Sequence, residues 1–316
     1  MTRKFADAIA VDNISFSVER GQVLGLLGLN GAGKTSSLRM LAGVLEPDAG
    51  EILINGESLQ HNPITAKRQI GYLPEVAPLY TDMKVHHYLD YAARLRRMNR
   101  QERRRQVDKQ ITDLDLLPVA NRRIGHLSKG YKQRVGIAQA IIHDPALVIL
   151  DEPSSGLDPE QMRDMRKLVK TLGKTHGVIF SSHLLGEVNE VCTHVSVLHQ
   201  GRMIHSGSMS ESSQPGNYRV RFAQSISEQQ LRFLPGIEDV ESLGPETFRL
   251  SSQSVAGHQL LTTMIKAEFT VTEFSPYETS LEMLFSSLVR TPDVTSTVSI
   301  DNDAHSVNPV LKQTGS

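Results

Sequence analysis

The sequence predicts an α/β protein with a mainly parallel sheet that helices cover on both faces. Three observations predict it: a glycine-rich turn near residue 30 follows an apolar strand and opens a helix, an apolar strand over 146–150 ends in two acidic residues, and another over 177–180 ends in Ser-Ser-His. Strand-length apolar runs that alternate with amphipathic helices indicate parallel strands joined by crossover helices. In such sheets, polar groups at the carboxyl ends of the strands form the ligand site.

The first elements favour an antiparallel β subdomain. Residues 1–20 are predicted to form an edge hairpin, because apolar and polar residues alternate over 14–18. A short strand over 51–56 closes with the hairpin signal Asn-Gly, and a further strand runs from residue 70 to a proline-interrupted loop.

Helices dominate the middle of the chain. Residues 84–117 are rich in helix formers, and apolar residues recur at helical spacing over 135–142 and 165–172. We therefore expect a helical subdomain at about 76–140 within a first domain of residues 1–210.

The glycine-rich turn Gly28–Thr35 has the form GxxxxGK[ST] and lies between a strand and a helix. This is the full context of a P-loop, whose backbone N–H groups and helix N-terminus converge on phosphates. The Lys34 ammonium can reach the β- and γ-phosphates, and the Thr35 hydroxyl can ligate Mg²⁺. The turn predicts a P-loop NTPase. Its candidate nucleotide-binding residues are Asn30, Gly31, Ala32, Gly33, Lys34, Thr35 and Ser36.

The acidic pair Asp151-Glu152 ends the buried strand after the P-loop. An aspartate in this place is the Mg²⁺-side carboxylate. The adjacent Glu152 is placed to orient and deprotonate the attacking water, which accelerates such reactions by roughly 10²–10⁴. No Asn-Lys-x-Asp guanine selector occurs in the chain, so a GTPase is disfavoured.

Over about its first 210 residues, the sequence resembles the nucleotide-binding subunits of ABC transporters. Six motifs in family order carry the resemblance, together with an aromatic residue at the adenine-stacking position. They are the P-loop, Glu75 at the Q-loop position, the signature-like Leu127–Arg134, the Walker B strand Leu147–Glu152, the D-loop Ser155–Asp158, the switch-like His183, and the aromatic Phe5.

The resemblance implies ATP and Mg²⁺ as cofactors and a head-to-tail pair of subunits. In such pairs, each ATP lies between one P-loop and the partner's signature, so Ser128 and Gly130 would face the γ-phosphate from the other chain. His183 would hold the γ-phosphate and the water. The implied catalytic residues are Glu152, His183, Lys34 and Asp158, and the implied metal-side residues are Thr35, Asp151 and Glu75.

Three departures from the family pattern stand out. Glu75 replaces the commoner glutamine, which would make its contact to metal or water anionic. In the signature, Lys129 and Tyr131 replace the usual glycine and glutamine, and this variant resembles cassettes that partner ABC-2-type permeases. Phe5 in place of tyrosine keeps the stacking face.

Composition sets further bounds. No apolar run approaches the ~20 residues of a membrane span, no hydrophobic signal segment opens the chain, and the single cysteine, Cys192, excludes an internal disulfide. The remaining histidines show no metal-ligand spacing. Residues 1–214 carry a charge of +4 and residues 215–316 a charge of −5, neither of which indicates a nucleic-acid binder. We expect a cytoplasmic protein held at the inner face of the cell membrane by its permease.

Seven arginines lie within residues 94–105. The simplest interpretation is a solvated helical face. A docking surface for an acidic partner or for anionic lipid headgroups is the alternative, whereas RNA binding is disfavoured because no aromatic residues interleave with the arginines.

The last hundred residues predict a small accessory domain. Residues 206–208 and 210–216 are predicted to form a Ser- and Gly-rich linker. Residues 217–290 alternate in a βαββαβ-type α+β pattern with a last helix over 281–289, and the polar residues 291–316 are expected to be disordered. No motif in this region indicates a chemistry.

These features predict the ATP-hydrolysing subunit of an ABC-2-type transporter, forming ADP and phosphate and powering a separate permease for export. One alternative is a soluble ABC protein acting on ribosomes or nucleic acid, which is disfavoured because only one P-loop occurs. The other is a regulatory subunit with little turnover.

Overall fold

The computed structural model describes residues 1–6, 8–209, 216–252 and 255–277. Within these ranges, none of the helices combines the length and hydropathy that crossing a bilayer requires. The predicted helix over 281–289 and the polar tail 291–316 lie outside the described residues. The linker prediction for residues 206–208 is wrong, because these residues end a strand, Arg202–Ser208.

A six-stranded sheet in the order β10-β9-β3-β8-β7-β6 is the centre of the first unit. Five strands run parallel, and β10 pairs antiparallel with β9 at one edge. The mainly parallel sheet is therefore confirmed. The strands are β3 (Val23–Leu27), β6 (Ile70–Leu73), β7 (Leu147–Leu150), β8 (Gly177–Ser182), β9 (His194–His199) and β10 (Arg202–Ser208).

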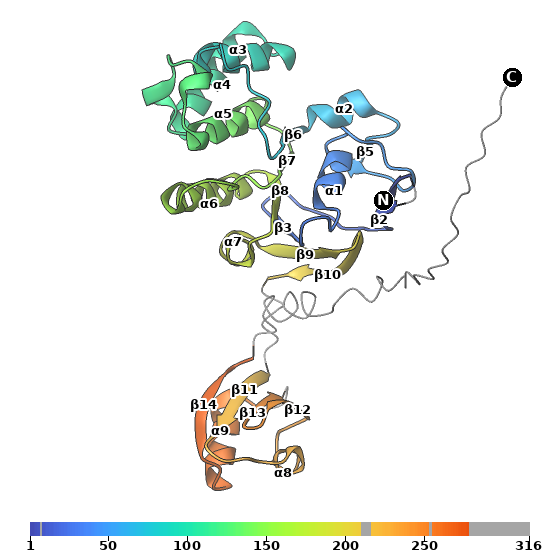
Figure 1. Ribbon diagram of the computed structural model, residues 1–316, viewed down its shortest axis with the longest axis vertical. Helices are drawn as coiled ribbons and strands as arrows, with labels where there is room; N and C mark the ends of the chain where they lie inside the picture. Colours follow the sequence, from blue (N-terminus) through green and yellow to red (C-terminus); the bar gives the residue numbers. More distant parts are fainter. Residues whose placement is uncertain (7, 210–215, 253–254, 278–316) are drawn as a thin grey trace, which may run out of the picture.

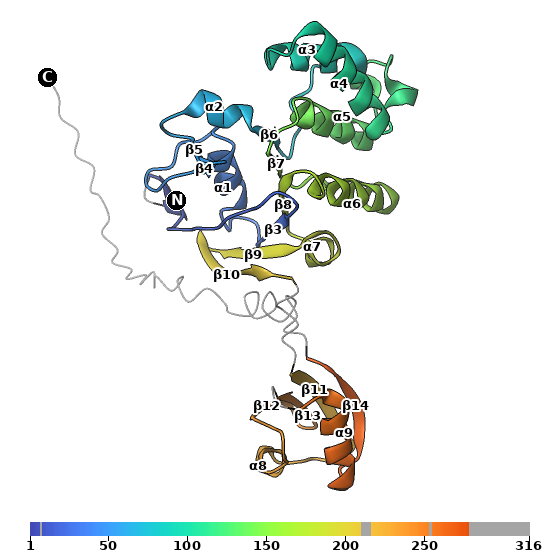
Figure 2. The ribbon, with the colours of Figure 1, turned by 180° about the vertical axis from the view of Figure 1, so that it is seen from behind.

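Helices cover both faces of this sheet (Figures 1 and 2). One face packs against α1 and the small hairpins, and the other against α5, α6 and α7. Because successive side chains of a strand point to opposite faces, Leu26 and Leu27 of β3 lie in two separate cores. The covering helices are α1 (Lys34–Leu41), α5 (Lys129–Ile141), α6 (Pro159–Gly173) and α7 (Leu185–Val191).

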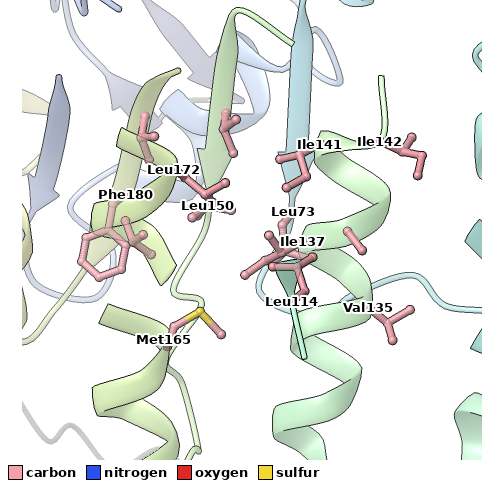
Figure 3. Close-up of a cluster of buried hydrophobic side chains, with 14 of the residues drawn as sticks. Leu73, Leu114, Val135, Ile137, Ile141, Ile142, Leu150, Met165, Leu172 and Phe180 are labelled. Atoms are coloured by element: carbon pink, nitrogen blue, oxygen red, sulfur yellow. The ribbon is translucent and has the colours of Figure 1, made fainter. Parts of the chain in front are cut away.

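The larger core fixes the carboxyl ends of the strands. Figure 3 shows Leu73, Leu150 and Phe180 of the sheet in one buried cluster with Ile137 of α5 and Met165 of α6. Burying one such side chain contributes about 1.5–3 kcal/mol. This packing holds the residues that directly follow β6, β7 and β8 at fixed positions along one edge of the sheet.

The antiparallel β subdomain consists of two short hairpins. In the second, Asn55 (φ 49°) and Gly56 (φ 82°) both adopt the left-handed conformation that a type I′ turn requires, so the predicted Asn-Gly turn is confirmed. The hairpins are β1 (Arg3–Phe5) with β2 (Ala8–Val11), and β4 (Leu53–Ile54) with β5 (Glu57–Ser58).

The predicted strand over residues 14–18 is wrong. The first hairpin spans only residues 3–11, and residues 13–19 form no strand. Ile14 is fully buried in the smaller core, and Phe16 and Val18 pack against it. The apolar–polar alternation over residues 14–18 therefore reflects an irregular segment that buries one side against the core and pairs with no strand.

A helical subdomain follows β6. Val85, Tyr88, Leu89 and Ala92 form the buried face of α3, as expected for one side of an amphipathic helix. The remaining elements in this part of the chain are α2 (Pro63–Arg68), α3 (Val85–Leu95), α4 (Arg100–Asp113) and the short 3₁₀ helices Leu117–Val119 and Ile124–His126.

The C-terminal unit is a four-stranded antiparallel sheet in the order β12-β13-β11-β14 with two helices. Its elements alternate as βαββαβ, as predicted, around a core of its own that contains Val220, Phe222 and Leu260. They are β11 (Asn217–Phe222), α8 (Glu228–Arg232), β12 (Asp239–Gly244), β13 (Thr247–Ser251), α9 (Gly257–Lys266) and β14 (Val271–Pro276).

Candidate functional site

The glycine-rich turn joins β3 to α1, and its backbone requires glycine. Gly31 (φ 82°) and Gly33 (φ 100°) are in the left-handed region. A Cβ on Gly33 would lie 2.4 Å from the carbonyl oxygen of Ala10, and one on Gly28 would lie 2.6 Å from that of Leu198. The turn is therefore packed between β2 and the end of β9, with its open side toward solvent.

A cavity of about 500 Å³ opens beside this turn. It brings the P-loop together with groups that follow β6, β7 and β8, because parallel strands all end at the same edge of the sheet. Its lining residues are Ala10, Leu29, Asn30, Gly31, Gly33, Lys34, Thr35, Ser36, Glu75, Glu152, Ser155 and His183.

Lys34 is 6% exposed and extends along the floor of this cavity. Its Nζ donates hydrogen bonds to the carbonyl oxygens of Gly28 (2.8 Å) and Leu29 (3.3 Å). It also lies 3.5 Å from Oε1 of Glu152. A buried ammonium needs hydrogen-bond acceptors and a compensating negative charge. Here two carbonyls and one carboxylate supply them, so an incoming phosphate can compete for the same donor.

Asp151 is almost fully buried beside Thr35. The Ser181 hydroxyl donates to Asp151 Oδ1 (2.8 Å), and the Thr35 hydroxyl forms a second side-chain hydrogen bond with the same carboxyl. Burial raises the pKa of Asp151 above its ordinary value, whereas these two hydrogen bonds lower it and the charges of Glu152 and Glu75 raise it further. A cation at this position would favour the ionised carboxylate.

The donor set fits Mg²⁺. Within the residues that the structure describes, no group of three or more His, Cys, Asp or Glu side chains forms a metal site. Mg²⁺ is usually held by one or two carboxylates together with substrate phosphates, rather than by an all-protein cage. Asp151 and the Thr35 hydroxyl, with Glu75 on the cavity wall, are such a set.

Glu152 and His183 form a hydrogen-bonded pair at the mouth of the cavity. His183 Nδ1 lies 2.6 Å from Glu152 Oε2. The backbone N–H of Glu152 donates to Ser181 Oγ (2.8 Å), and the residue adopts φ 45°, a costly conformation for a non-glycine. Neighbouring contacts thus hold the Glu152 carboxylate between the lysine and the histidine, where it can accept a proton from a water in the cavity.

Ser181 is the functional residue that sequence reasoning missed. It is fully buried on β8, and its hydroxyl connects Asp151 to the backbone of Glu152. The signal available in the sequence was a pair of serines at the end of an otherwise apolar strand, directly before His183. Ser155, which also lines the cavity, was predicted only as part of the D-loop.

The signature residues lie elsewhere. Ser128 and Gly130, at the N-terminus of α5, line a separate pocket of about 270 Å³ with Leu157 and Gln161. The side chain of Ser128 caps α5 by accepting from the backbone N–H of Tyr131 (3.4 Å). Neither residue lines the P-loop cavity of its own chain.

Lys129 contacts the D-loop of the same chain. Gly156, in the left-handed region (φ 64°), lies so close to this side chain that a Cβ on it would be 2.3 Å from Lys129 Nζ. The signature and the D-loop therefore meet within one chain.

Ala32 is buried within the turn and Asp151 beneath it, so neither lines the cavity, and Phe5 and Asp158 lie farther from it. Phe5 is 45% exposed on β1, with the Arg3 guanidinium 5.0 Å from its ring centroid. Asp158 is exposed and caps α6 by accepting from the backbone N–H of Gln161 (2.8 Å). Both remain predictions as nucleotide-site residues.

Known proteins share this arrangement. The model of the ABC transporter family matches residues 11–155. The chain is 34% identical over 287 residues to an uncharacterized ABC transporter ATP-binding protein, YxlF of Bacillus subtilis, covering 89% of this chain and 94% of YxlF. It is also 34% identical to the bacitracin transport ATP-binding protein BcrA of Bacillus licheniformis, covering 65% and 66%.

A solved structure agrees with these relatives. That of CbiO1 from Clostridium perfringens, part of the ABC transporter complex CbiONQ, superposes with a TM-score of 0.60 at 28% identity. The match covers 66% of this chain and 86% of CbiO1.

Proposed function

The chain belongs to the family of ABC transporter ATP-binding proteins, and on that premise we propose that two copies close head to tail around ATP to drive a separate ABC-2-type permease for export. As a member of this family it binds ATP and is an ATPase. The finer steps proposed here are the homodimer, the roles of individual residues, the use of Mg²⁺ and the kind of permease.

The separation of the signature from the P-loop is the observation that carries the proposal. Ser128 and Gly130 face a pocket that the P-loop does not share. The described part of one chain thus presents two half-sites, each lacking what the other has. A head-to-tail pair completes both at once, because an interface between two such surfaces places each P-loop opposite the partner's signature.

Within each half-site, Lys34 and the loop backbone would bind the β- and γ-phosphates. Thr35 and Asp151 would hold Mg²⁺, which neutralises phosphate charge when bound, with Glu75 nearby. Lys34 Nζ lies 3.5 Å from Glu152 Oε1, and phosphate would replace this carboxylate as the partner of the ammonium. This exchange would free the carboxylate to accept a proton from the attacking water, and His183 would orient the γ-phosphate and that water.

Transport coupling follows from the relatives. BcrA is named for bacitracin transport, and CbiO1 is part of a larger transporter complex. These names support a membrane transporter as the partner. Lys129 and Tyr131 in the signature support a permease of the ABC-2 type, with this subunit on the cytoplasmic face.

The test is the substitution Glu152→Gln. Removing the general base should lower ATP turnover by roughly 10²–10⁴ while ATP binding persists, so ATP-bound dimers should accumulate. Phosphate release and light scattering after size exclusion, with and without ATP and Mg²⁺, measure the two effects. Lys34→Ala is the control, because it should lose nucleotide affinity and form no dimer.

Two results would contradict the proposal. Wild-type phosphate release from Glu152→Gln would show that another group acts as the base. A wild-type chain that binds ATP without measurable turnover, beside its permease as well as alone, would favour the regulatory subunit.

A further inference from the structure

The corner between α3 and α4, residues 94–105, contains seven arginines. Three of them have partners inside the protein. Arg94 and Arg103 both pair with Asp90, and Arg96 donates to the carbonyl oxygens of Lys67 and Ile70. These four contacts tie the corner to α3, to α2 and to β6.

The other four arginines are exposed, and their side chains form no hydrogen bond or ion pair with any other described residue. Within these positions, Glu102 is the only acidic residue. We call them the free arginines of the corner. They are Arg97, Arg100, Arg104 and Arg105.

This arrangement opposes local stability. Arg100 is the first residue of α4, where the positive end of the helix dipole disfavours a cation. Arg100 and Arg104 are four residues apart on the same exposed face, so their like charges repel. Arg97 also adopts φ 59°, a conformation rare for a residue with a side chain. Conflicts of this kind concentrate where a surface serves a purpose other than folding.

An apolar side chain lies within the same corner. Leu95 is 65% exposed at the end of α3, between Arg94 and Arg96. Figures 1 and 2 show α3 and α4 at the end of the first unit farthest from β10, so the corner projects outward. A corner that carries both an exposed leucine and free arginines suits a bilayer interface, where the alkyl chain enters the headgroup layer and guanidinium groups meet phosphates.

We propose that the α3–α4 corner binds the anionic lipid headgroups of the membrane beside the permease. The inference rests on the proposed function, which brings this chain to a membrane surface. Nucleic acid is a poorer fit, because the corner contains no aromatic side chain on which a base could stack. A second contact with the bilayer would limit rotation of the subunit against its permease.

The expected gain in membrane affinity follows from surface electrostatics. Each basic residue near an anionic leaflet strengthens binding roughly fivefold, so the four free arginines together give several hundredfold at low ionic strength. Screening should remove most of that gain at about 0.5 M salt, where charges interact only over a few ångströms.

The experiment is co-sedimentation of the full chain, without nucleotide, with vesicles of phosphatidylglycerol and phosphatidylcholine or of phosphatidylcholine alone. The test variant replaces all four free arginines by glutamine. A matched control removes the same number of charges from the exposed face of α6 and from its C-cap residue, and circular dichroism verifies the fold of both. The control positions are Arg163, Lys167, Lys170 and Lys174.

We expect the wild-type chain and the α6 control to bind the phosphatidylglycerol vesicles in low salt, and the corner variant to lose this binding. Equal loss in the control would overturn the proposal, because the attraction would then be a general effect of charge. Binding of the corner to a poly-glutamate peptide, with no binding to vesicles, would overturn it in favour of an acidic protein partner.

These outcomes are independent of the proposed function. ATP-driven dimerisation of Glu152→Gln is measured in solution without lipid. Vesicle binding by a chain that fails to dimerise with ATP would refute the proposed clamp alone, whereas dimerisation without vesicle binding would refute the lipid contact alone.

Discussion

Removing the Ser181 hydroxyl should shift the Mg²⁺ and pH dependence of ATP hydrolysis. This hydroxyl donates to Asp151 Oδ1 at 2.8 Å and accepts from the backbone N–H of Glu152 at 2.8 Å, and the serine is fully buried. In Ser181→Ala, the carboxylate loses a donor and the N–H of Glu152 is left without an acceptor.

The magnitude can be worked from these contacts. A hydrogen bond to a charged group contributes about 1.5–3 kcal/mol, so loss of this donor should raise the Asp151 pKa further. The pKa should rise rather than fall, because the hydrogen bond from Ser181 lowers the Asp151 pKa, which burial raises. Only the ionised carboxylate can hold Mg²⁺, so the acidic limb of the pH–rate profile should move to higher pH.

The assay is ATP turnover against Mg²⁺ concentration at several pH values, and the same free-energy range predicts a half-saturating Mg²⁺ concentration about 10- to 100-fold higher. Ser182→Ala is the matched control. Ser182 is the next residue of β8, is equally buried, and donates to Glu187 Oε2 at 2.8 Å. Its loss should lower stability without changing the Mg²⁺ dependence. Identical Mg²⁺ curves for the two variants would refute the reasoning.

Two further substitutions test other parts of the site. Gly33→Ala should destroy ATP binding and destabilise the fold by about 1–3 kcal/mol, because its Cβ would lie 2.4 Å from the Ala10 carbonyl oxygen in a residue with φ 100°. Nucleotide titration and thermal melting measure the two effects. Gly186→Ala is the control, because a Cβ there meets nothing within 4 Å. Asp158→Ala should cost about 1 kcal/mol through loss of the α6 cap, whereas Asp158→Ser keeps a capping oxygen. Full ATPase activity in Asp158→Ser would show that the aspartate acts through the helix alone, whereas equal activity loss in both variants would support a direct catalytic role.

Much of the fold could be predicted because its signals are local. The glycine-rich turn, the Asn-Gly hairpin and the helix after Pro159 each depend on residues within a few positions of one another. The alternation over residues 14–18 led to a wrong strand prediction, because a strand also needs a second strand to pair with, and the hydropathy pattern does not show whether one is present. Ile14 is buried by the smaller core, not by pairing.

The site residues that directly follow strands in recognisable motifs could be predicted from the sequence. Those whose role depends on which strands are neighbours could not. Asp151 and His183 are visible as polar residues at strand ends, but the role of Ser181 depends on β8 lying directly beside β7. That adjacency joins residues thirty positions apart, and no short-range pattern specifies it. A hydroxyl in an apolar strand has the same appearance whether it faces Asp151, as Ser181 does, or Glu187, as Ser182 does.

Lys129, which stands where the signature usually has glycine, contacts the D-loop of the same chain. Lys129 Nζ lies against Gly156, and Ser155, one residue earlier, lines the P-loop cavity. Signature and D-loop are thus linked by side-chain contact inside one chain, while the proposed clamp would bring each signature to the partner's ATP. A shift of the signature on closing would then move the D-loop, and with it Ser155, in the same chain. In a head-to-tail pair, this linkage would make the geometry of each cavity depend on nucleotide in the other, because every signature serves one site and every D-loop borders the next.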